Sequence, residues 1–302
     1  MAILQHYYQS LYDCPVVELS GYRARYALGG PIYAYLDFGG ATGTAKDGLA
    51  EGMLAMAVQQ GKLASGQTVV EAGSSSFAAA LTLAARAAGH PVVLAVPESL
   101  SAQRQTALKA LGAKLVFSGS LYGRGGAEKL AAETAEKLGG YYMDFFRSDN
   151  NPEYHRRVTG PAVVRAIDGR EKSLVDAVVV GVGSGGTITG VGETVKAWTN
   201  DVRMVAVEPY ESQAIGGGFV GRHSIPGIGA GFVPENYNPY VVDLVAAVSS
   251  GDAAAAARDV LLADGIPACV SAGAVLCAAR RMLEKGQSRA ALCVFSGRQQ
   301  YD

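Results

Sequence analysis

Residues Val178 to Gly192 read VVVGVGSGGTITGVG and join an apolar run to a cluster of glycines. The apolar run is typical of a buried strand. The glycines let successive backbone N–H groups converge on one point, and a helix predicted from Thr187 to Trp198 adds partial positive charge there. The hydroxyls within the turn add further hydrogen-bond donors. The stretch therefore predicts a phosphate-binding turn, formed by Gly183, Ser184, Gly185, Gly186 and Thr187.

Strand-like and helix-like segments alternate on both sides of this turn. Strands are predicted at 68–73, 91–97, 114–119, around Tyr142, and at 176–183, 203–209, 243–248 and 290–295, and helices at 76–88, 101–111, 126–138, 152–167, 187–198, 252–262 and 272–283. Apolar strands separated by helices predict an α/β fold with mostly parallel sheets flanked by helices. The segment Ser148 to Pro152, SDNNP, predicts a boundary between two lobes.

The composition excludes several classes of partner and site. The chain of 302 residues has a net charge of −1, so neither nucleic acid nor an anionic membrane is expected as its main partner. The first twenty residues do not have the pattern of a secretory signal, and no apolar run is long enough for a transmembrane helix. Four cysteines without a CxxC pair predict reduced thiols, no metal site and a cytoplasmic location.

The residues alone leave two candidates for the phosphate compound. Gly181, Gly183 and Gly186 satisfy GxGxxG, and Glu208 lies 22 residues after Gly186, as in dinucleotide-binding NAD-dependent dehydrogenases. The other candidate is pyridoxal phosphate, which requires a lysine for covalent attachment. Lys46 follows a Gly/Thr turn in GGATGTAKDGLAEGM and opens an apolar helix.

Seven motifs occur in the order found in cysteine synthases. They are ATGTAKDGLA around Lys46, VEAGSSSFAAALTLAA from Val70, VPESLSAQRQTALKALGAKLV from Val96, NPEYHRRVTGPAVV from Asn151, the glycine-rich turn, HSIPGIGAGFVP from His223, and GIPACVSAGAVLCAA from Gly265. On this resemblance the chain is identified as a member of the cysteine synthase and cystathionine β-synthase group. The resemblance implies the two-lobed tryptophan-synthase-β-like fold of fold-type II pyridoxal-phosphate enzymes, a smaller domain at 42–149, a larger one at 1–41 and 150–302, and a homodimer.

The resemblance also implies roles for individual residues. Lys46 would hold pyridoxal 5'-phosphate and move the substrate Cα proton, and Ser271 would face the pyridine nitrogen, although Ser271 alone also fits a helix N-cap. The substrate and cofactor positions implied in addition are Gly73, Ser74, Ser75, Ser76, Phe77, Phe145 and Gly227. The implied reaction is β-replacement on a β-substituted L-amino acid through α-aminoacrylate, for example O-acetyl-L-serine and sulfide giving L-cysteine.

The substrate-carboxylate loop departs from the family pattern. Where cysteine synthases have Thr-Ser-Gly-Asn-Thr-Gly, this chain has GSSSFA from Gly73 to Ala78, and Phe145 falls where a glutamine is usual. Phe77 and Phe145 predict a more apolar pocket. This leaves open a cysteine synthase, an enzyme for a more apolar substrate, a β-elimination lyase, and a regulatory relative. His155 and His223 are interpreted as structural, since neither has a partner pattern for acid–base work.

Overall fold

The computed structural model describes residues 14–119 and 123–299, and the chain divides into two compact units. The first unit comprises Met1–Gly39, Gly43–Ala45 and Asn151–Asp302, and the second comprises Gly40–Thr42 and Lys46–Asn150. Lys46 is thus the first residue of the long segment of the second unit.

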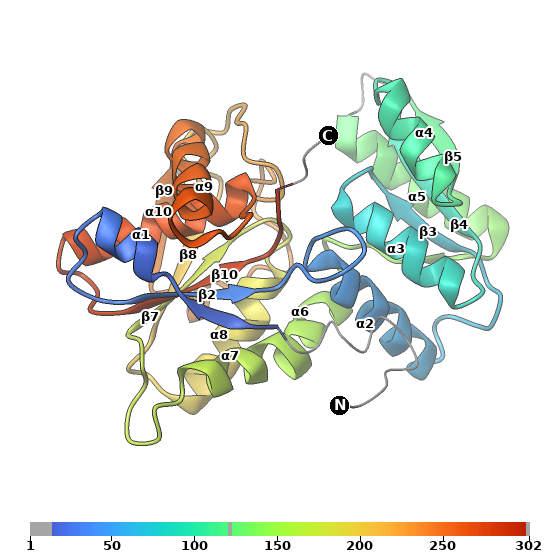
Figure 1. Ribbon diagram of the computed structural model, residues 1–302. Coiled ribbons are helices and arrows are strands. Elements are labelled where there is room, and N and C mark those ends of the chain that lie inside the picture. The colour runs from blue at the N-terminus through green and yellow to red at the C-terminus, as the bar shows by residue number, and fades with distance from the viewer. Residues whose placement is uncertain (1–13, 120–122, 300–302) are drawn as a thin grey trace. The chain divides into compact units, whose positions relative to one another are not determined.

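The first unit contains a six-stranded sheet in the order β1-β2-β10-β7-β8-β9 (Figure 1). All neighbouring strands run parallel except β1, which pairs antiparallel with β2. In sheet order, the strands are β1 (Val16–Glu18), β2 (Ile32–Leu36), β10 (Ala291–Phe295), β7 (Ala177–Gly181), β8 (Arg203–Pro209) and β9 (Leu244–Val248). The central strand β7 is nearly continuous apolar sequence, because both of its faces are buried by helices.

Helices cover both faces of this sheet. One face packs against α1 (Ser20–Arg25), α9 (Ser250–Asp264) and α10 (Val270–Glu284), and the other against α7 (Gly160–Ile167) and α8 (Gly186–Trp198). The chain enters α7 through α6 (Asn150–Tyr154) and a π-helical turn at His155–Thr159. A 3₁₀ turn lies at Pro239–Val241.

The second unit contains a four-stranded parallel sheet in the order β5-β4-β3-β6 (Figure 1). Its strands are β3 (Val69–Ala72), β4 (Val92–Pro97), β5 (Lys114–Ser118) and β6 (Tyr141–Tyr142), and its helices are α2 (Lys46–Gln59), α3 (Ser76–Ala87), α4 (Ala102–Ala110) and α5 (Gly123–Leu138). Ala131 and Ala135 of α5 pack on Val70, Val93 and Ala95 of the sheet. In both units the glycine- and serine-rich turns follow the carboxyl ends of strands, where parallel sheets place ligand sites.

The predicted α/β class is confirmed, and most predicted segments agree with the observed ones within a few residues. Two details differ. The single helix predicted at 152–167 consists of α6, the π-helical turn and α7. The strands β1 and β2 and the helix α1 were not predicted. Within the described residues, no helix is both long and apolar enough to cross a bilayer.

Candidate active site

The turn between β7 and α8 has the geometry of an anion cradle. Gly185 is the N-cap of α8 and adopts φ 85°, a left-handed conformation that favours glycine. The N–H groups in the first turn of a helix have no intrahelical acceptor, so those of Gly186 and Thr187 can bind an anion. A side chain is also excluded by contact, because a Cβ on Gly185 would lie 2.7 Å from the Tyr237 backbone nitrogen.

Both hydroxyls of the cradle contact the helix that precedes α7. Asn151 Nδ2 donates to Ser184 Oγ at 3.0 Å, and Ser184 is only 4% exposed. Thr187 Oγ1 lies 3.1 Å from His155 Nε2, and His155 is fully buried. The two hydroxyls are therefore held in defined positions by side chains rather than by solvent.

Gly227 and Ser271 lie next to the cradle within the first unit. A Cβ on Gly183 would be 2.3 Å from the carbonyl oxygen of Gly227, and a Cβ on Gly227 would be 3.8 Å from Ser271 Oγ. Ser271 is 5% exposed and is the second residue of α10, whose N-cap is Cys269. The N-cap interpretation of Ser271 was therefore wrong, and its hydroxyl instead lies 3.1 Å from Cys269 Sγ.

Glu208, the acidic residue expected to bind a ribose in a dinucleotide site, already accepts two backbone hydrogen bonds. Glu208 is 3% exposed, and its carboxylate accepts from the backbone N–H groups of Ile215 at 2.9 Å and Gly216 at 3.0 Å. Burial raises the pKa of Glu208. A buried carboxyl held by its own loop is not available for a ribose hydroxyl, so this turn fits a single phosphate group better than a dinucleotide.

The second unit presents Lys46 at the first position of α2. The start of this helix is fixed because Asp47 Oδ2 accepts from the backbone N–H of Thr42 at 3.0 Å and from its hydroxyl at 2.9 Å. A Cβ on Gly40 would lie 2.3 Å from the same carboxylate oxygen. Lys46 Nζ lies 5.4 Å from the ring centroid of Phe145, within the range of a cation–π contact.

Phe145 and Phe77 form a stacked pair beside Lys46. Their ring centroids are 4.1 Å apart with an interplanar angle of 17°, and the residues are 7% and 1% exposed. Asp144, which precedes Phe145, adopts φ 50°, a left-handed conformation unusual for a residue with a side chain. The backbone is therefore locally strained at the residue before Phe145.

The turn from Gly73 to Ser76 leads from β3 into α3. Gly73 adopts φ 101°, and Ser75 is the N-cap of α3 without a side-chain capping hydrogen bond. The first-turn N–H groups of α3 can therefore bind a carboxylate. Arg104 anchors the turn from α4, because its Nε and a terminal nitrogen donate to the Ser74 carbonyl at 3.0 and 2.8 Å.

A buried carboxyl group on β3 binds the backbone of Phe145, one member of the stacked phenylalanine pair. Glu71 on β3 is 3% exposed, and it accepts from the N–H groups of Ala72 at 2.8 Å and Phe145 at 3.2 Å. Burial nevertheless raises the pKa of Glu71 to about 8, because two backbone donors do not compensate for the lost hydration.

This pKa predicts a pH-dependent stability. The unfolded carboxyl titrates near 4.5, so between this value and about 8 the folded state holds a proton that the unfolded state has released. Stability should therefore fall as pH rises through this interval and level off above it, by roughly 5 kcal/mol in total. Glu71→Gln should remove most of this slope in urea unfolding measured from pH 5 to 9. The exposed Glu98→Gln serves as control, and an unchanged slope in the Glu71 variant would contradict the assignment.

The structure gathers the predicted residues into two groups, one in each unit. The first unit brings together the cradle at 183–187, Gly227 and Ser271, and the second brings together Lys46, the turn at 73–77 and Phe145. Side chains that contact these groups and were not predicted as site residues include Asn151, His155, Arg104, Glu71 and Cys269. For Asn151 and His155, the spacing of four residues at the start of the helix predicted at 152–167 is the one local signal of a shared face.

Known proteins resemble the chain over nearly its whole length. The family described as "Pyridoxal-phosphate dependent enzyme" matches residues 9–297. A cysteine synthase from Staphylococcus aureus (strain Mu50 / ATCC 700699) is 34% identical over 265 residues, which are 87% of this chain and 84% of that protein.

Solved structures agree with this match. O-acetyl serine sulfhydrylase isoform 3 from Entamoeba histolytica superposes with a TM-score of 0.90 at 30% identity, covering 98% of this chain and 89% of that one. O-ureido-L-serine synthase superposes with a TM-score of 0.89 at 27% identity, covering 98% and 92%. The match of a pyridoxal-phosphate family to residues 9–297 and of a cysteine synthase to 87% of the chain decides against the dinucleotide alternative, and the chain belongs to the family of pyridoxal-phosphate-dependent enzymes.

Proposed function

We propose that the enzyme catalyses β-replacement on a β-substituted L-amino acid, with O-acetyl-L-serine and sulfide giving L-cysteine and acetate. The observation that carries the proposal is the match over 98% of the chain to two enzymes whose names both contain an O-substituted serine. The local geometry supports it, because each unit supplies a group of side chains suited to one part of this reaction.

The residues of the first unit fit the cofactor. The cradle at 183–187 offers N–H groups and two hydroxyls for its phosphate, and Ser271 offers a neutral hydroxyl for its ring nitrogen. When bound, pyridoxal phosphate withdraws electrons from the substrate Cα and makes the proton there acidic. A hydroxyl protonates the ring nitrogen less firmly than a carboxylate would, which favours loss of a β-substituent over transamination.

The residues of the second unit act on the substrate. Lys46 would hold the cofactor covalently, and its freed amine would remove and return the proton at the substrate Cα. The first turn of α3 would bind the substrate carboxylate through N–H groups at Ser76 and Phe77, and the Ser76 hydroxyl is assigned to the cofactor. Arg104 keeps the turn in place through Ser74.

The reaction is tested by supplying both substrates. Purified enzyme with O-acetyl-L-serine and sulfide should form L-cysteine and acetate in equal amounts. Release of acetate with pyruvate and ammonia, but without cysteine, would instead identify a β-elimination lyase. No consumption of O-acetyl-L-serine with or without sulfide would reject the cysteine synthase assignment.

The stacked pair Phe77 and Phe145 favours a second candidate, an enzyme of the same chemistry for a more apolar amino acid. The pair occupies the place where the family resemblance puts polar groups for a small substrate.

The double substitution Phe77→Thr and Phe145→Gln tests this candidate. It should lower the dissociation constant for small amino acids such as O-acetyl-L-serine by about tenfold, since new hydrogen bonds to a carboxylate contribute roughly 1.5 kcal/mol. Titration of the enzyme's absorbance spectrum measures the constant. Phe117→Gln, an exposed phenylalanine in the same unit, is the control. Unchanged affinity would show that these rings do not line the carboxylate position.

The resemblance to cysteine synthases further supports a cytoplasmic homodimer. Light scattering should give twice the mass of one chain, and the mass of a single chain would contradict the dimer.

A further inference from the structure

The segment formed by α6 and the π-helical turn, which precedes α7, approaches α8 closely. A Cβ on Gly186 would lie 1.9 Å from Asn151 Oδ1, and a Cβ on Gly190 would lie 2.6 Å from the Cβ of His155. Gly186 and Gly190 are one helical turn apart on α8, so together they form a flat strip without side chains. Only this strip lets Asn151 and His155 reach the start of α8.

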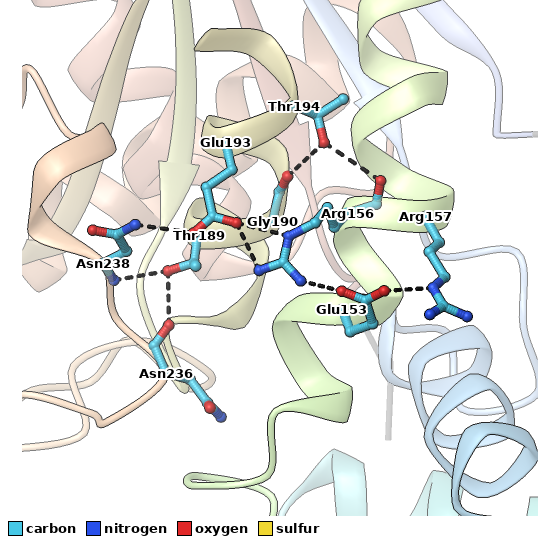
Figure 2. A network of polar contacts seen from close by, with 9 residues as sticks. All are labelled: Glu153, Arg156, Arg157, Thr189, Gly190, Glu193, Thr194, Asn236 and Asn238. Carbon is cyan, nitrogen blue, oxygen red and sulfur yellow. Dashed lines mark hydrogen bonds and ion pairs between the residues drawn. The ribbon is translucent and has the colours of Figure 1, made fainter. Parts of the chain in front are cut away.

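A polar network fixes the two helices in this register (Figure 2). Arg156 binds Glu193 of α8 through two nitrogens at 2.6 and 2.7 Å and also pairs with Glu153 of its own helix. Thr194 Oγ1 lies within hydrogen-bond distance of the carbonyl groups of Arg156 and Gly190. Asn238 Nδ2 donates to the other carboxylate oxygen of Glu193 at 2.9 Å. Since several charged groups share partners, the network holds position better than a single exposed ion pair.

Within this register, two side chains spaced by four residues meet the two hydroxyls of the cradle. Asn151 Nδ2 donates to Ser184 Oγ, so the hydroxyl hydrogen of Ser184 remains free to be donated elsewhere. The equivalent contact of Thr187 depends on His155, whose Nδ1 lies 2.9 Å from Thr159 Oγ1 and whose Nε2 lies 3.1 Å from Thr187 Oγ1.

The neutral imidazole of His155 has two tautomers with opposite consequences. With the proton on Nε2, His155 donates to Thr187 and accepts from Thr159, and the hydroxyl hydrogen of Thr187 can point into the cradle. With the proton on Nδ1, Thr187 must donate to His155, and only its lone pairs would face the anion. The first arrangement attracts a phosphate and the second repels it.

We propose that Asn151 and His155 are positioning residues that turn the Ser184 and Thr187 hydroxyls into donors toward the cofactor phosphate, with His155 held as the Nε2-protonated tautomer. Thr159, the last residue of the π-helical turn at His155–Thr159, contacts the other ring nitrogen. The proposal rests on the cradle assigned under the proposed function, but it concerns cofactor binding and not the reaction catalysed.

Matched substitutions test the proposal in the full-length enzyme. The amide nitrogen of glutamine can occupy the place of His155 Nε2, whereas that of asparagine occupies the place of Nδ1. His155→Gln should therefore keep the cofactor dissociation constant within about threefold, and His155→Asn should raise it by about tenfold or more, the size expected for a hydrogen bond to a charged group. The ³¹P resonance of the bound phosphate should move in the asparagine variant and stay in place in the glutamine variant.

A second pair of substitutions tests Asn151. Asn151→Asp replaces the donated amide by an acceptor and should also raise the dissociation constant by about tenfold or more. The neighbouring Asn150→Asp makes the same change of charge and retains the oxygen that accepts from Gln60 Nε2 at 2.8 Å, so its affinity should change little.

The tautomer can be measured in the wild-type enzyme, with a variant needed only to assign the signal. Nitrogen-15 NMR of histidine-labelled holoenzyme, assigned with the His155→Gln variant, should show a protonated Nε2 on His155. An unprotonated Nε2 on His155, or equal cofactor affinity of the His155→Gln and His155→Asn variants, would overturn the proposal. If wild-type enzyme binds the cofactor but does not convert O-acetyl-L-serine, the proposed function fails while these binding measurements still decide the present proposal.

Discussion

Lys46→Ala is expected to lower kcat/KM for O-acetyl-L-serine and sulfide by at least about a thousandfold, because the variant lacks both the covalent anchor and the base for the Cα proton. The purified variant should also lack the visible absorbance that the wild-type enzyme shows with its cofactor. Activity assays and absorption spectra of the two proteins at equal concentration measure both effects.

The control for Lys46 is an exposed lysine of the same unit. Lys62→Ala removes an equal charge near the end of α2 and should leave both the activity and the spectrum unchanged. Circular dichroism should show that the Lys46 variant is folded, since its side chain is only partly buried. Wild-type turnover by the Lys46 variant would show that another residue carries the chemistry.

Gly185→Ala is expected to weaken cofactor binding by about a hundredfold or more. The new side chain is strained in the left-handed conformation at φ 85°, at a cost of roughly 1–2 kcal/mol. Its Cβ would also lie 2.7 Å from the backbone nitrogen of Tyr237, so the cradle must open to admit it. Titration of cofactor into the resolved enzyme gives the dissociation constant.

Gly251→Ala is the matched control for this effect. Gly251 lies near the start of α9 in the same unit, and a Cβ there would meet no atom within 4 Å. This control should bind the cofactor as the wild type does. Equal affinity of the Gly185 variant would mean that the turn at 183–187 does not hold the phosphate.

The parts of the fold that the sequence predicts well are those with strong local patterns. The buried strands β4 and β7 are continuous apolar runs, and α8 begins directly after a glycine cluster. By contrast, β1 has three residues at a sheet edge, and β2 lies beside β10 from the opposite end of the chain. Such pairing depends on long-range contacts that no local window contains.

The same distinction applies to the site. The cradle and Lys46 could be predicted because glycine spacing and a lysine at a helix start are local features. The partner of His155 is Thr187, 32 residues away, and their contact depends on the glycine at 190; His155 itself begins a π-helical turn. Periodicity predicts a regular helix at 152–167 and cannot show that tertiary packing inserts this turn.

The central claim is that Lys46 carries the cofactor, and covalent trapping tests it most directly. Borohydride reduction of the cofactor-loaded enzyme, followed by proteolysis and mass spectrometry, should place one phosphopyridoxyl group on the peptide that contains Lys46. A label on a different lysine, or an unlabelled protein, would contradict the account.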